Sequence, residues 1–293
     1  MTPHPLSQSR QMAATIRFIA ERKNTVAPRA QSVGVDPLSS TDTRFSVLIV
    51  CEYSATVRDA FRARGFDAWS NDILPTEGDP RWHIQGDCRD AINSRYWDLI
   101  VMHVPCTAMA VCGNSTYGTG KAKHGERLEA IRWTVETARL ALQQAPCVAL
   151  ENGASVIFPV LRNKLGADVQ YAHPWQHGHP EQKKTGLALW GLPRLTETAN
   201  VHAEMMELPR HIRERVHFMS PGPERGKERA RFYPGFAAAM ADQWGDHIKQ
   251  SRSDLPAAGA GDQANLPAAS ASQGGGLCDV QRPFHGERYD NLA

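Results

Sequence analysis

The sequence predicts an α/β protein whose core is a doubly wound, mainly parallel β-sheet, with a very small second region. Strand-like and helix-like patterns alternate between residues 44 and 250, as they do in folds built from β-α-β units. The first strand-like segment, residues 45–51 (FSVLIVC), is apolar throughout, which is typical of a strand covered on both faces. The predicted strands of the first half are followed by polar or reactive residues, and doubly wound sheets bind ligands at such carboxyl ends.

In the first half, a helix is predicted over residues 56–64, because Val57, Ala60 and Phe61 share one face and Gly65 ends the pattern. Further strands are predicted over residues 67–71, 82–85 and 97–103. The residues that follow these strands are Glu52, Asp72, Asp87, and the pair Pro105 and Cys106.

In the second half, a long helix is predicted over residues 125–144, and a strand over 147–150 ends at Glu151 and Asn152. A helix over 155–165 and strands over 169–171 and 187–190 follow. The expected buried face of the long helix consists of Leu128, Ile131, Val135, Ala138 and Leu142. A last helix begins after Pro234 and Gly235 and is expected to bury Phe236, Met240 and Trp244.

Composition divides the chain into five regions. Residues 1–43 are expected to be a flexible N-terminal segment, 44–190 the catalytic core, and 191–230 a short insertion or reduced recognition region. Residues 231–250 form the closing helix. Residues 251–293 contain few bulky apolar side chains and are expected to be a flexible tail. Within that tail, residues 278–293 could instead be a short docking peptide.

The bulk composition is that of an ordinary globular protein. The 293 residues are 41% hydrophobic and 22% charged, and the formal net charge of +2 neither demands nor excludes nucleic acid. The six cysteines form no C-x-x-C pair, and no secretory signal is apparent, so we expect reduced thiols in the cytoplasm. No apolar run approaches the roughly 18 residues of a membrane span.

Cys106 and Glu151 follow neighbouring apolar strands. A thiol after Pro105, in a loop of small residues, suits a nucleophile whose thiolate is favoured and accessible. A carboxylate at the end of a buried strand is a candidate general acid. Two alternatives stay open: Cys106 as a buried structural cysteine, and Glu151 as a helix cap or an ion-pair partner.

The carboxylates Glu52, Asp72 and Asp87 suit a cofactor that contains a nucleoside, because a carboxylate after the second strand can accept hydrogen bonds from ribose hydroxyls. The first turn, residues 51–58 (CEYSATVR), has no glycine-rich fingerprint, so a dinucleotide site is disfavoured.

These residues resemble a known family. Pro105-Cys106 and Glu151-Asn152 are similar to the PC and EN motifs of the DNA cytosine-5 methyltransferases. Residues 177–184 (HGHPEQKK) resemble the family's later FG-x-PQ-x-R-x-R motif. Residues 46–245 look most like the short methyltransferase-like proteins of phages and prophages.

The resemblance implies a Rossmann-like fold of the S-adenosylmethionine-dependent methyltransferase type and methylation of cytosine at C5 in DNA. The target base is flipped out of the duplex, Cys106 adds to C6, and Glu151 protonates N3. The remaining roles that the resemblance implies are bracing of the Cys106 loop by Asn152, contact with phosphate or base by Lys184, and a pocket for S-adenosylmethionine lined by Glu52, Tyr53, Ser54, Asp72, Asp87 and Pro105.

The sequence departs from the family pattern at several positions. Ser54 and Ala55 stand where the family has a glycine-rich turn, and Val104 replaces a proline. Lys184 and Gly186 replace the two arginines of R-x-R. Residues 190–227 are far fewer than a normal target-recognition domain, and sequence readout needs side chains in a groove. We therefore expect low specificity, a single-stranded or smaller substrate, or a partner protein that supplies specificity.

Two other sets of residues suggest partners. The histidines at 173, 177, 179 and 202 lack a zinc-ligand spacing, so we expect structural or substrate-contact roles and no metal. The basic runs 210–215 and 225–231 could contact a phosphate backbone, although solvated helices carry such runs routinely. Trp175 could stack on a base, but a core position is the simpler interpretation.

Two functional hypotheses follow. One is an S-adenosylmethionine-dependent cytosine C5 methyltransferase, with a variant that uses another donor group or a free nucleotide. The other is a non-catalytic DNA- or protein-binding descendant of the same fold, such as a phage accessory factor. The presence of both Cys106 and Glu151 favours the enzyme, because a binding module needs neither.

Overall fold

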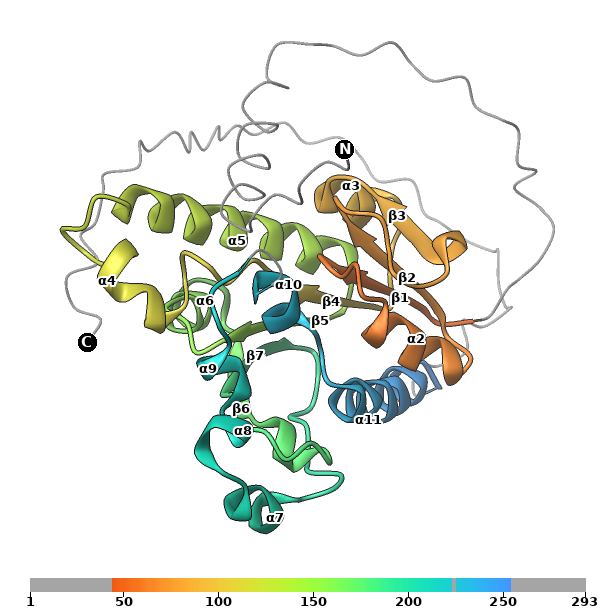
Figure 1. The fold of residues 1–293 in the computed structure, drawn as a ribbon. Coiled ribbons are helices and arrows are strands. Elements are labelled where there is room, and N and C mark those ends of the chain that lie inside the picture. Colours follow the sequence, from red (N-terminus) through yellow and green to blue (C-terminus); the bar gives the residue numbers. More distant parts are fainter. Residues whose placement is uncertain (1–43, 223–224, 254–293) are drawn as a thin grey trace, which may run out of the picture. The chain divides into compact units, whose positions relative to one another are not determined.

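The computed structural model describes residues 44–222 and 225–253, which contain a seven-stranded sheet with helices on both faces (Figure 1). The predictions for residues 1–43 and 254–293 lie outside the described residues. The strand order is β3-β2-β1-β4-β5-β7-β6. The strands are β1 (Ser46–Val50), β2 (Asp67–Asp72), β3 (His83–Gln85), β4 (Leu99–His103), β5 (Cys147–Gly153), β6 (Asp168–Ala172) and β7 (Thr185–Trp190).

Neighbours among β1 to β5 pair in parallel, whereas β7 pairs antiparallel with both β5 and β6. The strand order reverses beside β1, between β1 and β4, which is where doubly wound sheets open a crevice for ligands. The predicted α/β class with a doubly wound, mainly parallel sheet is therefore confirmed.

The helices are α2 (Thr56–Ala63), α3 (Cys88–Asn93), α4 (Asn114–Tyr117), α5 (His124–Gln144), α6 (Ile157–Leu165), α7 (His202–Glu207), α8 (Arg210–Arg213), α9 (Arg215–Phe218), α10 (Arg225–Ala230) and α11 (Pro234–Ser253). Five of the helices in the described residues, α2, α3, α5, α6 and α11, contribute most of the helical side chains that pack on the sheet. In the described ranges, no helix is both long and apolar enough to cross a membrane.

One face of the sheet is covered by α2 and α11. Alternate residues of β1, Val47 and Ile49, contribute to a buried cluster with side chains from these two helices, as the alternation of side chains along a strand requires. As predicted, α2 contributes Val57 and Phe61, and α11 buries Phe236, Met240 and Trp244. The continuous apolar run of β1 is thus explained by its cover on both sides.

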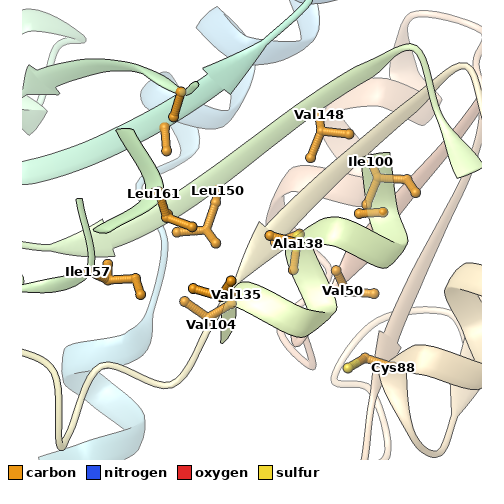
Figure 2. Packing of buried hydrophobic residues seen from close by; sticks show 14 of the residues in the cluster. Val50, Cys88, Ile100, Val104, Val135, Ala138, Val148, Leu150, Ile157 and Leu161 are labelled. Carbon is orange, nitrogen blue, oxygen red and sulfur yellow. The ribbon is translucent and has the colours of Figure 1, made fainter. Parts of the chain in front are cut away.

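The other face is covered by α3, α5 and α6. Leu48 and Val50 join this second cluster, and Figure 2 shows Val50, Ile100 and Leu150 from three strands close to Val135 and Ala138 of α5. The strands β1, β4 and β5 are parallel neighbours and pack on the same helices, so their carboxyl ends lie next to one another.

The predicted buried face of α5 was wrong at its start. Leu128 is 41% exposed, whereas Arg127 is buried. The guanidinium of Arg127 donates to the carbonyls of Ala108 and Ala110 at 2.7 and 3.2 Å and to the side-chain oxygen of Asn114 at 2.8 Å. Because these hydrogen bonds anchor the first turn of α5, the buried face begins one residue earlier than the apolar pattern indicates.

Two boundaries also differ from the predictions. Glu151 and Asn152 lie within β5 and pair with β7, instead of following the strand. Residues 251–253, predicted in the tail, belong to α11. The short helices α3, α4 and α7 to α10 were not predicted, because segments of four to six residues carry too little periodicity to be recognised.

Candidate active site

The carboxyl ends of β1, β4 and β5 bring most of the predicted site residues to one edge of the sheet. Val50 at the end of β1 is level with Met102 of β4, and His103 of β4 is level with Glu151 of β5. The loop that carries Cys106 begins directly after β4. The order of the strands therefore places the thiol, the carboxylate and the first turn side by side.

Cys106 begins a tight turn, in which the amides of Met109 and Ala110 donate to its carbonyl at 3.0 and 2.8 Å. Its side chain reaches the surface, so the alternative of a buried structural cysteine is wrong. The surrounding protein desolvates the thiol, and the charge of Glu151 adds to this, so the pKa of Cys106 is raised. The positive charges of Lys183 and Arg229 oppose that shift. Cys106 is thus a thiol at neutral pH, and forming its thiolate requires a proton acceptor.

Glu151 is buried, and its carboxylate lies 3.1 Å from Nδ1 of His103. Burial by itself raises the pKa of Glu151, but the hydrogen bond from His103 and the charges of His103 and Lys183 bring that pKa below its usual value. The carboxylate is therefore ionised at neutral pH. Glu151 is hydrogen-bonded to His103, and it is also close enough to Cys106 to act on it electrostatically.

Asn152 makes the contact that was expected of it. Its side-chain amide donates to the carbonyl of Val104 at 2.9 Å, two residues before Cys106. This hydrogen bond fixes the start of the Cys106 loop to β5. Arg127 fixes the other side of the loop through Ala108 and Ala110, a role that the sequence analysis missed.

The turn between β1 and α2 is strained. Cys51 and Ala55 have positive φ values of 60° and 62°, a left-handed conformation that side chains other than glycine rarely adopt. The turn thus keeps a geometry suited to glycine although the sequence has none there. Such strain persists where the surroundings enforce it and is concentrated at functional sites.

Glu52 and Asp87 both bind backbone amides. The carboxylate of Glu52 is buried and accepts hydrogen bonds from the amides of Val57 and Arg58, at 2.6 and 3.2 Å, at the start of α2. Asp87 caps α3 by accepting from the amide of Arg89 at 2.9 Å. These two carboxylates therefore shape the site and have fewer oxygen lone pairs left for a ligand.

Asp72, at the end of β2, is the carboxylate best suited to a ribose. Its side chain accepts a hydrogen bond from the backbone amide of Leu74 at 2.9 Å and also interacts with the amide of Ile73. Burial, together with the charge of Glu52, raises its pKa to about 6. Near neutral pH, Asp72 is a partly buried carboxylate with acceptor capacity to spare.

This raised pKa predicts a pH effect on stability. A carboxyl whose pKa is higher in the folded state stabilises the fold fully below about pH 4 and loses that contribution as the pH rises through about 6. We expect Asp72→Asn to raise the free energy of unfolding at pH 7 by on the order of 1 kcal/mol, after discounting for partial exposure, and to change it little at pH 4. Urea unfolding at both pH values checks this; an equal effect at both would contradict it.

A small pocket lies beside the strained turn. It is lined by Cys51, Glu52, Tyr53, Ser54, His103, Ala230 and Phe232. Its chemistry suits a polar cofactor such as S-adenosylmethionine, because Nε2 of His103 is buried there without a hydrogen-bond partner in the described residues. Its cavity volume of about 20 Å³ holds roughly one water molecule. The enclosed part of the pocket is therefore smaller than a nucleoside.

The two neighbouring lysines have different surroundings. Lys184, the predicted contact for phosphate or base, places its ammonium 4.3 Å from the ring centre of Tyr171. Lys183 instead acts electrostatically on both Cys106 and Glu151, and its ammonium donates to the carbonyl of Arg229 at 3.3 Å. The cations that act on Cys106 are therefore Lys183 and Arg229, and the role expected of Lys184 stays a prediction.

The basic runs are partly neutralised by neighbouring carboxylates. Lys227 and Arg231 both pair with Glu77, at 2.7 and 3.2 Å, and Arg215 pairs with Glu181 at 3.2 Å. Tyr53 donates from its hydroxyl to the carbonyl of Lys227 at 3.3 Å. The contacts of Lys227 and Arg231 thus join residues 227–231, which border the pocket, to Tyr53 in the turn after β1 and to Glu77 in the loop after β2.

The histidines bind neighbouring protein groups. His177 lies 3.0 Å from the hydroxyl of Thr198 and stacks on Phe236, and His179 accepts from the amide of Gly235 at 2.8 Å. Trp175 is half-buried between His173 and His202. In the part of the chain that the structure describes, no three His, Cys, Asp or Glu side chains gather as metal ligands do.

Comparison with known proteins finds similarity in structure alone. No family model matches the sequence, and no curated protein matches it. Methyltransferase EhMeth of Entamoeba histolytica matches 54% of this chain over 57% of its own, with 15% identity and a TM-score of 0.41. The Dnmt2 methyltransferase of S. pombe matches 55% over 58%, with 15% identity and a TM-score of 0.36.

A DNMT2 mutant of Spodoptera frugiperda matches 50% of each chain, with 13% identity and a TM-score of 0.32. In all three pairs, the matched region spans less than two thirds of the methyltransferase. Similarity at these identities concerns the fold alone. These similar structures are methyltransferases.

Proposed function

We propose that this chain is an S-adenosylmethionine-dependent methyltransferase that modifies C5 of cytosine in DNA, with Cys106 as the nucleophile. The observation that carries the proposal is the meeting of three features at one sheet edge: the Cys106 thiol, the buried Glu151 carboxylate and the strained turn at Cys51 and Ala55. A structural role alone explains neither a surface thiol beside a buried acid nor left-handed backbone without glycine.

The chain's own residues would act as follows. Cys106 adds to C6 of the flipped base and Glu151 gives a proton to N3, so that C5 becomes nucleophilic and takes the methyl group. Loss of the C5 proton to solvent then breaks the bond between Cys106 and C6 and restores the free thiolate. Lys183 and Arg229 stabilise the thiolate, because their charges already act on Cys106. Asn152 and Arg127 hold the loop on both sides of the thiol. S-adenosylmethionine, when bound, supplies the electrophilic methyl group; Asp72 and the residues of the pocket would hold it.

The small size of the region after β7 limits how DNA could be read. Residues 191–230 contain four helices of four to six residues, α7 to α10. Base-specific readout in a duplex needs an element that enters a groove. We propose that the substrate is single-stranded DNA, or duplex DNA presented by a partner protein.

The test is transfer of labelled methyl from S-adenosylmethionine to a panel of acceptors: single-stranded DNA, duplex DNA, RNA and free cytidine nucleotides. We expect label in single-stranded DNA, removed by prior substitution of its cytosines with 5-methylcytosine. Label in RNA or free nucleotide alone would support methyl transfer to cytosine but would reject DNA as the substrate. No label in any acceptor, with the protein folded, would reject the proposed reaction.

The second candidate is a non-catalytic binding protein of the same fold. Two observations favour it: the pocket beside the turn holds about 20 Å³, and the pKa of Cys106 is raised. A protein that never binds the cofactor needs neither an open pocket nor a thiolate.

Cofactor binding separates the two candidates. If the pocket binds S-adenosylmethionine, a concentration of about 100 times Kd adds roughly 2.7 kcal/mol to stability, a rise in Tm of about 5–10 °C for this size. Cys106→Ala should show the same rise, because Cys106 does not line the pocket. Calorimetry or thermal denaturation measures it; no shift at millimolar ligand favours the binding protein.

A further inference from the structure

His103 is the last residue of β4 and lies in register with Glu151 of β5. Its Nδ1 atom is 3.1 Å from the carboxylate of Glu151, and the two side chains are each 12% exposed. The His103 ring also packs edge-on against Phe232, with the ring centres 4.9 Å apart. The imidazole is therefore held between the carboxylate on one side and the segment before α11 on the other.

The second nitrogen of the ring has a different environment. Nε2 of His103 is buried and has no hydrogen-bond partner in residues 44–222 and 225–253. The ring lines the pocket together with the strained turn after β1. A buried polar atom without a partner is costly, so its retention here indicates that it serves a bound molecule or a proton.

The charged groups around this pair come from three elements. Glu52 of the turn after β1 acts on His103 electrostatically, Glu151 bonds to it from β5, and Lys183 acts on Glu151 from the segment before β7. Ala230 and Phe232, which close the pocket, carry no charge. The His103–Glu151 pair therefore has one acidic neighbour, Glu52, and one cationic neighbour, Lys183.

We propose that His103 is a positioning residue for the methyl transfer, which orients Glu151 and supplies the proton that Glu151 passes to N3 of the pyrimidine. This inference rests on the proposed function. The resemblance assigned the acid role to Glu151 alone, and nothing in the sequence pattern connects it with His103. The physical reason for a pair is that a buried, ionised carboxylate has no proton to donate unless a neighbour provides one.

The proton balance of this step is simple. The Cys106 thiol first loses its proton to solvent. As the thiolate adds to C6, the His103 imidazolium passes its Nδ1 proton to the Glu151 carboxylate, and Glu151 passes that same proton to N3, so that the carboxylate ends the step ionised, as it began. The imidazole is left neutral. When the bond between Cys106 and C6 breaks at the end of the reaction, N3 returns the proton by the same path. No oxidant or further reactant is needed.

Two substitutions separate positioning from packing. In His103→Asn the amide nitrogen occupies roughly the place of Nδ1, so a donor to Glu151 is kept but cannot titrate. In His103→Gln the amide occupies roughly the place of Nε2, so the donor to Glu151 is lost. We expect kcat to fall at least tenfold in His103→Asn and further in His103→Gln, with KM for DNA unchanged within about twofold.

The pH dependence of kcat distinguishes proton sharing from packing, because a residue that only supports the fold would not change the pH at which kcat falls. In the native protein the active form carries the shared proton, so kcat falls as the pair loses it at high pH. In His103→Asn only the carboxyl can carry that proton, and ordinary carboxyls lose it about two units below imidazole. The alkaline limb should therefore move down by one to two pH units. An unchanged limb in an active His103→Asn variant would overturn the proposal.

A measurement on the native fold keeps this test separate from the proposed function. Nitrogen NMR of histidine-labelled protein reports which ring nitrogen of His103 carries a proton, with His103→Asn assigning the signal. We expect a protonated Nδ1 whose titration changes in Glu151→Gln. If no acceptor is methylated but this change is seen, the proton-sharing pair stands and the substrate proposal fails. If Glu151→Gln leaves the titration of His103 unchanged, the pair itself is rejected.

Discussion

Replacing Cys106 with alanine is expected to abolish methyl transfer, by about 10⁴-fold or more, because loss of the nucleophile removes the covalent route entirely. The free energy of unfolding should stay within about 0.5 kcal/mol of the native value, since the Cys106 side chain is exposed and away from the core clusters. Labelled methyl incorporation and urea unfolding measure the two effects. Loss of activity without loss of stability is the signature of a reacting group.

Cys112 provides a matched control for this experiment. It lies in the segment after Cys106 and is also exposed. Cys112→Ala should keep full activity, because no interaction connects its thiol with Glu151. DNA that contains 5-fluorocytosine should trap a denaturation-resistant adduct with the native protein and with Cys112→Ala, but none with Cys106→Ala. An adduct that persists without Cys106 contradicts the proposed nucleophile.

Gly186→Ala is expected to give the largest change in stability, a loss of about 3 kcal/mol. A Cβ added at Gly186 would overlap the ring of Phe158, which is buried in the core beneath β7. Overpacking of a closed core typically costs 1–3 kcal/mol, and a rigid ring between paired strands places this change at the upper end. Gly186 is also in register with Asn152, so the distortion should reach the Cys106 loop and lower activity as well.

Gly153→Ala serves as the control, because Gly153 ends β5 and a Cβ there meets nothing within 4 Å. It should change stability by less than about 1 kcal/mol. Combining Gly186→Ala with Phe158→Leu should recover part of the loss, because the smaller side chain makes room for the methyl group. Equal effects of the two glycine substitutions in urea unfolding would contradict the packing argument.

This steric conflict also explains one departure from the family pattern. The resemblance would place an arginine at position 186, but Phe158 fills the space that any side chain there would need. Glycine at this position therefore follows from the packing of α6 under β7. The sequence showed the departure, and the contact with Phe158 supplies its physical cause.

The sequence was sufficient to predict the sheet and most of its cover. The apolar run of residues 45–51, the alternation of strands with helices, and the spacing of Phe236, Met240 and Trp244 all correspond to buried elements. These signals are strong because burial on one or both faces requires regular spacing of apolar residues. At Leu128 the same spacing gave a wrong prediction. The hydrogen bonds of Arg127 to the Cys106 loop and to Asn114 turn the start of α5 so that Arg127 is buried and Leu128 is exposed.

The sequence also predicted that Cys106, Glu151 and Asn152 lie together, because residues at the ends of apolar strands meet at one edge of a parallel sheet. It could not identify His103 or Lys183. Residues 103 and 151 are related only by the register of β4 with β5, and consecutive residues of an extended segment point to opposite sides, so no motif decides between Lys183 and Lys184. The sequence by itself determined the fold class and the placement of Cys106 and Glu151 at one edge of the sheet. Only the tertiary structure decided which side chains surround these two residues, because register and packing between distant segments set those contacts.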